Sequence, residues 1–439
     1  MIKELLNDII NYSACGVLLY LFFLAIRSNK EYFFIEIAVF FALIQWVLAP
    51  AFMETIEIEG FKPFQLITNA RIISYFSYSI SSFIVLFMAL FLFLRKKKNV
   101  VVRRVLDEMK SPEQQGFNGK IGIIYIVVGA ISSLIFALFN IPVISVILSF
   151  LWNLIPVGII HVIYSRIRGQ FIILTLGIIY FLSIGVKTGL FFQTMIWLGI
   201  IAIFAFLKYK FPTILKLSFL ILAIPGVLIL QVAKHEYREK TWGDKEITGS
   251  KSLLLISELK ETALNIDFKE SSKYTFLPIA LRMNQAHIDG KVMKNIPKRK
   301  PFQNGKTISK SFLSVFVPRP LWPGKYTYGN EKMLDLANHK LGKNAFFTVS
   351  IMGESYANFG LKGGVAFLCI FLFILKALYV RIIGQNYGRV YLLFFSPAIF
   401  YTVIRTEIDF YQIFANLIIS YILFTFIAKA TSRIYNQST

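Results

Sequence analysis

The chain has 439 residues, 56% of them hydrophobic, and its mean hydropathy is +0.63. This composition excludes an ordinary soluble globular protein, because many segments reach the roughly 17–25 apolar residues that cross a bilayer as a helix. Lysine and arginine (47) outnumber aspartate and glutamate (24), which gives a net charge of +23. In a membrane protein this excess concerns orientation and anionic partners, so we expect no nucleic-acid partner. The two cysteines, Cys15 and Cys369, lie in apolar segments and predict neither a disulfide nor a metal site.

The hydrophobic segments predict an all-α, polytopic integral membrane protein of about eleven transmembrane helices. The predicted spans are 10–27, 33–53, 73–94, 121–139, 143–164, 170–185, 189–207, 213–233, 360–380, 391–405 and 411–428. Basic residues crowd the short loops on one side, as in the run Arg95 to Lys98, and the positive-inside rule makes that side cytoplasmic. The predicted organisation is an N-terminal transmembrane bundle (1–233), an extracytoplasmic loop domain (234–345) and a C-terminal part (346–439). That last part holds a re-entrant segment and three transmembrane helices.

The polar interval 234–345 is predicted to contain helices outside the membrane. SKSLLLISELKETALNI (250–266) has helical periodicity, and KYTFLPIALRMNQAHIDG (273–290) predicts an amphipathic helix that stops at Gly290. Nine lysines and arginines and no acid lie between Gly290 and Asn330. Membrane headgroups explain this excess as well as a pyrophosphate or an acidic glycan does.

Two neighbouring segments have the residue types of a binding site. SFLSVFVPRPLWPGK (311–325) is predicted to be a shaped loop, because its prolines remove backbone donors, and it presents Arg319 and Lys325 beside Trp322. Alternatively, it only turns the chain at the bilayer surface. FFTVSIMGESYANFGLKGG (346–364) places Glu354 and Tyr356 in a glycine-rich approach to a long apolar helix.

VPRPLWPGK and GESYANFGLKGG resemble the Wzy-type polymerases of lipid-linked oligosaccharide repeat units. The similar region runs from Arg282 to Gly364, with weaker agreement around Lys187 and Arg405. The resemblance implies a GT-C-like fold in the bacterial cytoplasmic (inner) membrane, with the active site on the periplasmic or external face.

The same resemblance implies a membrane glycosyltransferase that makes O-antigen (lipopolysaccharide), capsule or exopolysaccharide. A growing glycan would pass from undecaprenyl pyrophosphate to the terminal sugar of a new lipid-linked repeat unit. The implied partners are the undecaprenyl-pyrophosphate-linked oligosaccharide, membrane lipid, and a chain-length regulator and flippase of the same pathway; no cofactor is expected. A ligase for finished glycans and a flippase for lipid-linked sugars are the competing functions.

Departure of a lipid pyrophosphate develops negative charge, which fixed cations can neutralise. Arginine suits this task because its planar fork binds phosphate oxygens bidentately. Accepting a sugar also requires a base at the acceptor hydroxyl, and Glu354 is the first candidate, with His339 and His287 as alternatives. The expected catalytic residues are Glu354, Arg319, Arg405 and Arg282; the expected substrate-binding residues are Lys325, Lys187, His339, Tyr356, Trp322 and Glu407.

Several of these residues have a simpler interpretation. Arg405, which is followed by Glu407 and Asp409, can form a polar turn that anchors a helical hairpin, and Lys187 can extend to the interface from the end of a span. Glu54, Glu57 and Glu59 offer an alternative metal site, but a cation-rich site makes a metal unnecessary, and none is predicted.

Overall fold

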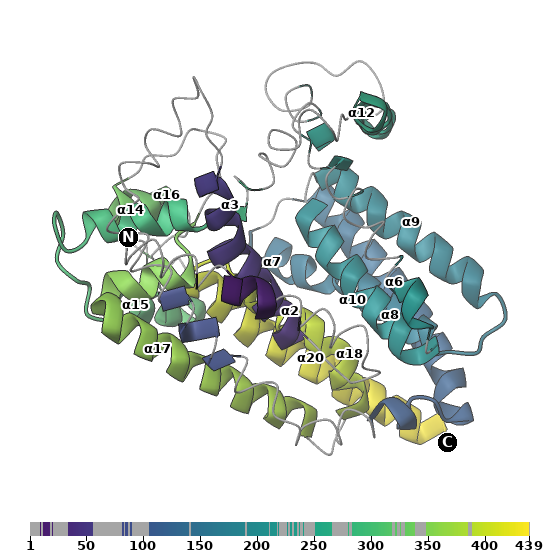
Figure 1. Cartoon of the computed structure of the whole chain (residues 1–439). Helices are drawn as coiled ribbons and strands as arrows, with labels where there is room; N and C mark the ends of the chain where they lie inside the picture. Colours follow the sequence, from purple (N-terminus) through teal and green to yellow (C-terminus); the bar gives the residue numbers. More distant parts are fainter. Residues whose placement is uncertain are drawn as a thin grey trace.

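The computed structural model is helical wherever it describes regular structure (Figure 1). It describes residues 9, 12–17, 20, 34–55, 81, 82, 84–86, 88, 89, 105–139, 142–188, 191–209, 211–216, 218, 226, 229, 230, 232–234, 237, 240, 251–265, 280, 283–317, 321, 322, 325, 330–338, 348–384 and 389–438.

The helices fall into three groups along the chain. The first group is α2 (Phe34–Leu43), the π-helix η1 (Ile44–Leu48), α3 (Ala49–Thr55), α6 (Pro112–Leu138), α7 (Pro142–Leu151), α8 (Leu154–Ile163), α9 (Gln170–Thr188) and α10 (Phe191–Tyr209). The second is α12 (Lys251–Asn265), α14 (Ala286–Asn295), α15 (Lys306–Phe316) and α16 (Asn330–Ala337). The third is α17 (Ile351–Gly384), α18 (Arg389–Ile399), α19 (Tyr401–Ile404) and α20 (Phe410–Ser438).

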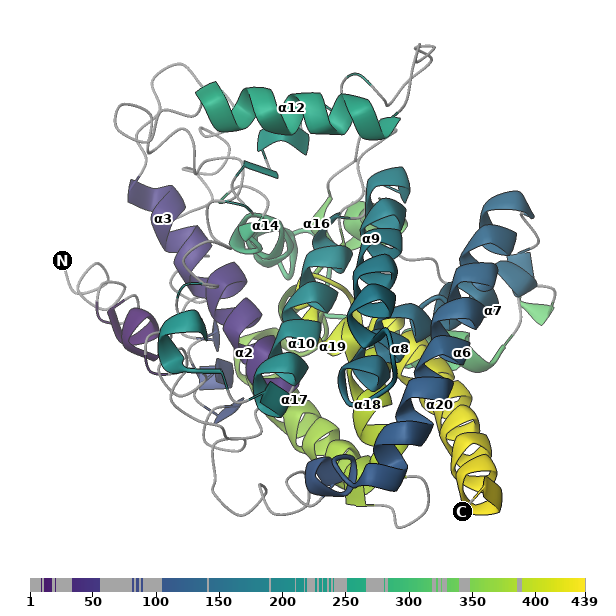
Figure 2. The ribbon, with the colours of Figure 1, turned by 90° about the vertical axis from the view of Figure 1, so that its right-hand side faces the viewer.

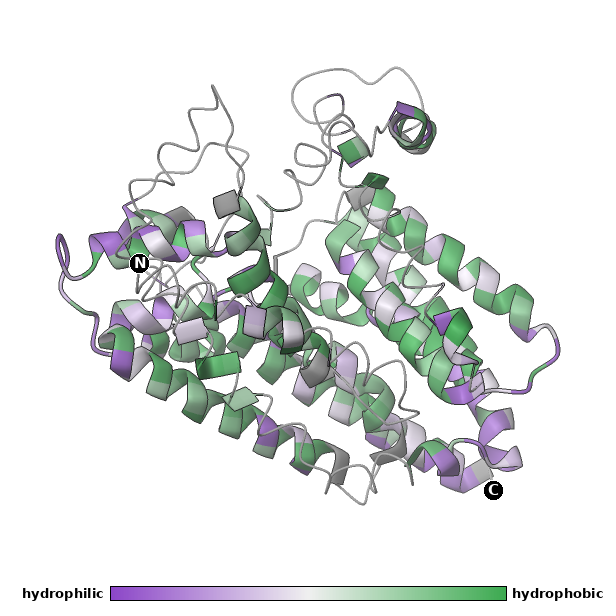
Figure 3. Cartoon of the chain, viewed as in Figure 1, coloured by the Kyte–Doolittle hydropathy of each residue, from purple (hydrophilic) through white to green (hydrophobic). Residues whose placement is uncertain are grey.

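Within the described residues, five helices are long and apolar enough to cross a membrane, counting α7 and α8 as one. They are Pro112–Leu138, Ile144–Ile163, Phe191–Tyr209, Ile351–Ile382 and Phe410–Gln437. Each corresponds to a predicted span, and Figure 3 shows hydrophobic residues along their length and hydrophilic ones on α14 and α16. The chain is therefore a multi-pass membrane protein.

The other predicted spans correspond to shorter helices or lie largely outside the described residues. Shorter apolar helices, Ile37–Met53 and Gln170–Val186, match the spans at 33–53 and 170–185. The span at 391–405 is two short helices, α18 and α19, with Pro397 inside α18. The spans at 10–27, 73–94 and 213–233 lie largely outside the described residues.

Helices α6 and α8 pack so closely that only glycine fits between them. A Cβ on Gly158 would lie 2.6 Å from the carbonyl oxygen of Gly122, and one on Gly122 would lie 2.9 Å from that of Gly158. This small-residue contact is typical of helix pairs in membranes, where close backbone approach takes the place of the hydrophobic effect. The outward face of α6 stays exposed and apolar, with Ile124, Val127 and Ile131 about half exposed.

The ends of the helices that are predicted to be cytoplasmic meet on one side of the molecule. Gln114 at the start of α6 donates a hydrogen bond to the hydroxyl of Tyr391 at the start of α18 (2.9 Å). Lys208 at the end of α10 donates to the carbonyl of Ser165 in the turn after α8 (3.0 Å). Phe117 contacts Tyr435 near the C-terminus, with 5.1 Å between ring centroids.

Helix α17 is broken at Gly360, which has φ +69° and ψ −169°. Few residues other than glycine adopt this conformation. The short first part, 351–359, folds against the second, because Gly364 lies against the backbone of Ser355 and a Cβ there would come within 3.0 Å of it. The glycines of FGLKGG thus allow the short helix 351–359 to rest on the N-terminal end of a long apolar one.

The structure corrects two boundaries in the polar interval and confirms one helix there. The helix predicted at 250–266 is present as α12, which lies across the ends of α9 and α10 (Figure 2). The helix predicted at 273–290 is interrupted, because Asn284 and Gln285 are not helical and α14 begins at Ala286. Helix α14 then continues past Gly290 to Asn295, since glycine inside a helix costs only about 1 kcal/mol. The segment predicted as a loop from Ser311 is helical to Phe316, because the prolines restrict the backbone only from Pro318 onward.

Candidate functional site

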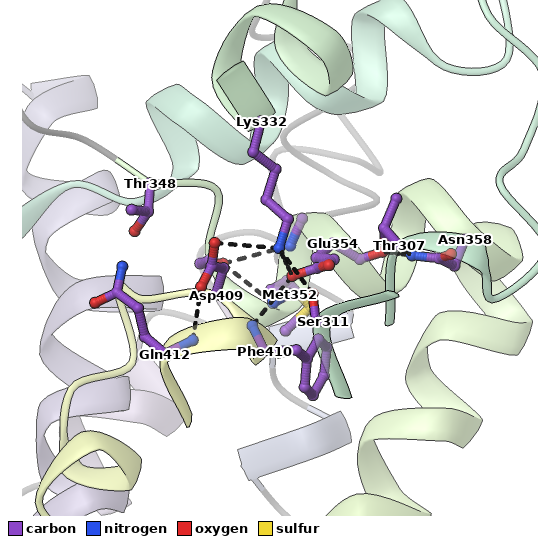
Figure 4. Close-up of polar contacts among 12 residues, drawn as sticks. Thr307, Ser311, Lys332, Thr348, Met352, Glu354, Asn358, Asp409, Phe410 and Gln412 are labelled. Carbon is purple, nitrogen blue, oxygen red and sulfur yellow. Dashed lines mark hydrogen bonds and ion pairs between the residues drawn. The ribbon is translucent and has the colours of Figure 1, made fainter. Parts of the chain in front are cut away.

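A buried ion cluster forms where α15, α16, α17 and the start of α20 meet (Figure 4). Lys332 Nζ lies 2.8 Å from Glu354 Oε2, 3.1 Å from Asp409 Oδ2 and 3.4 Å from Ser311 Oγ. These three acceptors match the three N–H donors of an ammonium group. All four side chains are fully buried. We refer to these four residues as the Lys332 cluster.

The Lys332 cluster carries more negative than positive charge. Burying an ion costs several kcal/mol unless it is paired and hydrogen-bonded, and here two carboxylates share one ammonium. Burial disfavours the charged lysine, but attraction to Glu354 and Asp409 outweighs that effect, so the pKa of Lys332 is raised above its ordinary value. The lysine therefore stays charged, and a second carboxylate remains without a full counter-charge.

Glu354 is held on one side only. Its Oε2 accepts from Lys332 and from the backbone N–H of Phe410 (3.1 Å). Its Oε1 is buried and has no hydrogen-bond partner among the described residues. An unpaired buried carboxylate oxygen is costly, and such atoms are often retained where a proton or a ligand is bound.

The backbone around the cluster explains how the other carboxylate is fixed. Asp409 Oδ1 accepts from the N–H of Gln412 (3.0 Å), so Asp409 caps α20 while its Oδ2 contacts Lys332.

Helix α15 is connected to the cluster through Asn358 of α17. Asn358 donates to Thr307 Oγ1 on α15 and to the carbonyl of Glu354, both at 2.7 Å. Helix α15 is thereby fastened over the cluster.

A third carboxylate, Asp289 of α14, lies at the start of α17. Its Oδ2 accepts from Ser350 Oγ (2.6 Å), which in turn accepts from the N–H groups of Met352 (3.1 Å) and Gly353 (3.3 Å). Gly353 must lack a side chain here, since a Cβ would lie 2.3 Å from Asp289 Oδ1. Burial raises the pKa of Asp289 to about 7, although the hydrogen bonds from Ser350 offset part of the effect.

A second polar group surrounds Arg405, in the turn that precedes α20. Arg405 Nε donates to Glu407 Oε1 (2.8 Å), and the other oxygen, Oε2, accepts from Gln45 Nε2 (3.1 Å). Thr406 donates to Gln45 Oε1, and the Gln45 carbonyl accepts from the N–H of Gln285 (3.2 Å). About a quarter of the Arg405 side chain (27%) is exposed, whereas Glu407 is nearly buried (9%). The Nε of Arg405 is therefore fixed by Glu407, while the side chain as a whole is partly exposed.

The π-helix η1 places Gln45 in this group. One extra residue in a helical turn shifts the side chains and frees a backbone carbonyl, and such insertions are frequent at functional sites. Gln45 is 2% exposed within a run of apolar residues. In the sequence, an amide side chain within an apolar run was the only sign that Gln45 has a polar role. Its hydrogen-bond partners are seen only in the fold.

The structure brings some predicted site residues together. Glu354 meets the turn after Arg405 through Asp409, which shares the Lys332 cluster, whereas Arg405 and Glu407 belong to the group around Gln45. Tyr356 lies nearby, where its hydroxyl donates to the carbonyl of Ile296 (3.3 Å). Lys325 donates to the carbonyl of Val317 (3.0 Å) at the end of α15, and its N–H bonds the carbonyl of Trp322 (2.9 Å).

Other predicted residues are not placed. Arg282, Arg319 and His339 lie outside the described residues, as do the side chains of Lys187, Glu54, Glu57 and Glu59. His287 is described, and its N–H bonds Asn284 Oδ1 (3.3 Å).

Sequence reasoning missed Lys332, Asp289 and Gln45, and it placed Asp409 in the charged turn after Arg405 without assigning it a role. Lys332 had one usable indication, since it lies four positions before Leu336 and thus on the buried face of the amphipathic helix α16. Asp409 and Asp289 look like ordinary helix-end acids in the sequence, and only their tertiary neighbours distinguish them.

Comparison of the chain with models of protein families, with curated proteins and with solved structures finds no match.

Proposed function

We propose that this protein is a polymerase of lipid-linked oligosaccharide repeat units, acting at the outer face of a bacterial cytoplasmic membrane. The single observation that carries the proposal is the state of Glu354: one carboxylate oxygen is fixed by Lys332 and Phe410, and the other is buried without a partner among the described residues. The resemblance of VPRPLWPGK and GESYANFGLKGG to Wzy-type polymerases supports it. We also propose that the chain has eleven membrane spans in a GT-C-like arrangement.

In the proposed reaction, Glu354 Oε1 accepts the proton of the acceptor hydroxyl. The acceptor oxygen forms the new glycosidic bond as the bond between the donor sugar and its pyrophosphate breaks, and undecaprenyl pyrophosphate leaves. Arg405, Arg282, Arg319 and Lys325 together neutralise the departing pyrophosphate.

This chemistry requires the cluster to open. Glu354 is fully buried, and a base must come within hydrogen-bond distance of the proton that it removes. Helix α15 contributes Thr307 and Ser311 to the contacts that cover Glu354 and Lys332. We propose that α15 moves aside when substrate binds.

Deletion of the gene tests the reaction class. A polymerase predicts that single repeat units are still made and exported but that no length ladder forms. Long polymer that is merely unattached would favour a ligase, and units retained on the cytoplasmic leaflet would favour a flippase. Undiminished attached polymer would exclude both the polymerase and the ligase.

Two substitutions test the roles of residues in purified enzyme with lipid-linked substrate. Glu354→Gln should abolish polymer formation, because an amide cannot accept the proton, whereas Glu331→Gln on the exposed face of α16 should not. Arg405→Lys should lower the rate by ~100–1,000-fold, the usual effect of losing one contact to a transition-state charge.

A chelator tests the alternative metal site. Activity that excess chelator removes and a divalent ion restores would exclude the cationic mechanism and favour a metal site at Glu54, Glu57 and Glu59.

A further inference from the structure

Helix α15 has an exposed stripe that is cationic at one end and apolar at the other. Lys306 and Lys310 are exposed in its first half, and Phe312, Leu313 and Phe316 are 44%, 51% and 56% exposed in its second half. The opposite face is buried, and it consists of Thr307, Ile308, Ser311 and Ser314. Three large apolar side chains on one exposed face are unusual for a helix that faces only water.

The position of α15 against its neighbours gives its direction relative to the membrane. Gly305, just before the helix, lies against the ring of Phe359, above the break in α17. Phe312 contacts Phe414, with 5.5 Å between ring centroids. Phe414 lies one turn inside α20, the candidate span that begins at Phe410. Helix α15 therefore lies beside the first turns of this span, with Phe312 in its second half at the level of Phe414.

The charges along the segment fit an anionic surface at that height. Lys306 and Lys310 belong to the run of nine cations without an acid between Gly290 and Asn330. Of these cations, Lys300 pairs with Asp335 of α16 and Lys325 bonds the carbonyl of Val317. An exposed helix face that combines lysines with phenylalanine and leucine side chains has the composition of a helix at a bilayer interface.

We propose that the exposed stripe of α15 is inserted in the outer leaflet of the membrane. Phe312, Leu313 and Phe316 enter the boundary between headgroups and acyl chains, and Lys306 and Lys310 contact anionic lipid phosphates. The loop domain is thus anchored in the bilayer by a helix that does not span it.

This anchoring has a structural consequence for the Lys332 cluster. The buried face of α15 carries Ser311, which contacts Lys332, and Thr307, which contacts Asn358. One helix therefore separates lipid on its outer face from the buried ion pairs on its inner face. The inference does not depend on the proposed reaction, because lipid contact at α15 is measured without any activity.

Spin labels measure the depth of the stripe in the full-length protein reconstituted in vesicles. The background replaces Cys15 and Cys369, and it is used only if its thermal midpoint matches that of the wild type. Labels are placed at Leu313 and Phe316, with Leu176 on the exposed face of α9 as the membrane control and Lys298 as the aqueous control. We expect the labels at 313 and 316 to be accessible to oxygen and protected from a water-soluble nickel chelate, as at 176.

Two results would overturn the insertion. The first is that the labels at 313 and 316 are as accessible to the nickel chelate as the aqueous control label at 298. The other is strong spin–spin broadening at 313 in dilute vesicles, which would show that a second copy of the chain covers the stripe.

The role of the lysines is tested by lipid composition. Depth at 313 is compared in vesicles of phosphatidylcholine alone and of phosphatidylcholine mixed with phosphatidylglycerol. We expect a greater depth with the anionic lipid, and we expect Lys306→Gln with Lys310→Gln to remove that difference, while Lys294→Gln on α14 keeps it. Equal depth in both lipids for the unaltered lysines would overturn the headgroup contact.

Discussion

Lys332 is the residue on which the charge balance of the buried cluster depends. Lys332→Met keeps the length of the side chain but leaves Glu354 and Asp409 buried without a counter-charge. Removing one partner of a buried ion pair typically costs about 3–5 kcal/mol, so we expect a loss of that order in the free energy of unfolding, measured in detergent. Lys310→Met, on the exposed face of α15, should change it by about 0.5 kcal/mol or less.

A double variant separates charge from packing at the same position. If the loss in Lys332→Met comes from uncompensated carboxylates, adding Asp409→Asn should restore part of the stability. A double variant that is less stable than the single one would show that Lys332 acts through its shape and not through its charge.

Asp289 gives a residue-scale prediction about pH. Its folded pKa of about 7 is above the ordinary value of 3.8, so the folded state holds a proton that the unfolded state has released between these values. Stability from this group is therefore full below about pH 4, falls as the pH rises towards 7, and then stays constant. The nearest ionisable groups in the chain are His287 and Lys291, and Glu354 follows Gly353, which lies against Asp289.

Asp289→Asn removes this titration while the amide oxygen can still accept from Ser350. We expect the variant to gain stability relative to the wild type at pH 8, by an amount on the order of a few kcal/mol, and to show no gain near pH 4. Unfolding midpoints measured across this range provide the check. A stability difference that is the same at every pH would contradict the raised pKa.

At the scale of elements, the break in α17 determines where Glu354 sits. Gly364 lets the short helix 351–359 rest on the long one, and a Cβ there would come within 3.0 Å of the Ser355 backbone. Gly364→Ala should cost about 1–3 kcal/mol, the usual price of overpacking. Gly199→Ala, in α10 with open space around it, should be neutral or stabilising, because alanine favours helix over glycine by about 1 kcal/mol.

The two glycine variants are compared by thermal unfolding in the same detergent. Equal midpoints for Gly364→Ala and Gly199→Ala would show that the two parts of α17 are not packed as described.

At the scale of the whole molecule, the prediction concerns orientation. The turn after α8, the end of α10 and the C-terminal part of α20 meet at one end, and their basic residues predict that this end is cytoplasmic. The Lys332 cluster and α15 belong to the opposite end. A reporter fused after Lys300 should be external, and one fused after Arg166 or after Lys98 should be cytoplasmic. Reporters at Lys300 and Arg166 on the same side would exclude both the orientation and the proposed outer-face chemistry.

Much of the fold could be predicted from the sequence, because in a bilayer the formation of a helix depends on the residues of its own segment. Inside a membrane every backbone group must bond within its own segment, so a run of apolar residues such as 121–139 or 411–428 is sufficient to predict a helix. Boundaries were less predictable. The predicted span at 360–380 begins at the residue where α17 breaks, whereas α14 continues through Gly290, where the sequence predicted a helix end.

The candidate site was predicted only in part. The sequence by itself determined that this is a helical membrane protein, that cations gather in one polar interval, and that Glu354 and the 405–409 turn border long apolar helices. Only the tertiary structure decided that Lys332 pairs with both Glu354 and Asp409, and that Gln45 supports the turn of Arg405. The physical reason is that apolar runs and charge runs are local properties of a chain, whereas a buried ion pair exists only where packing removes water from residues far apart in sequence.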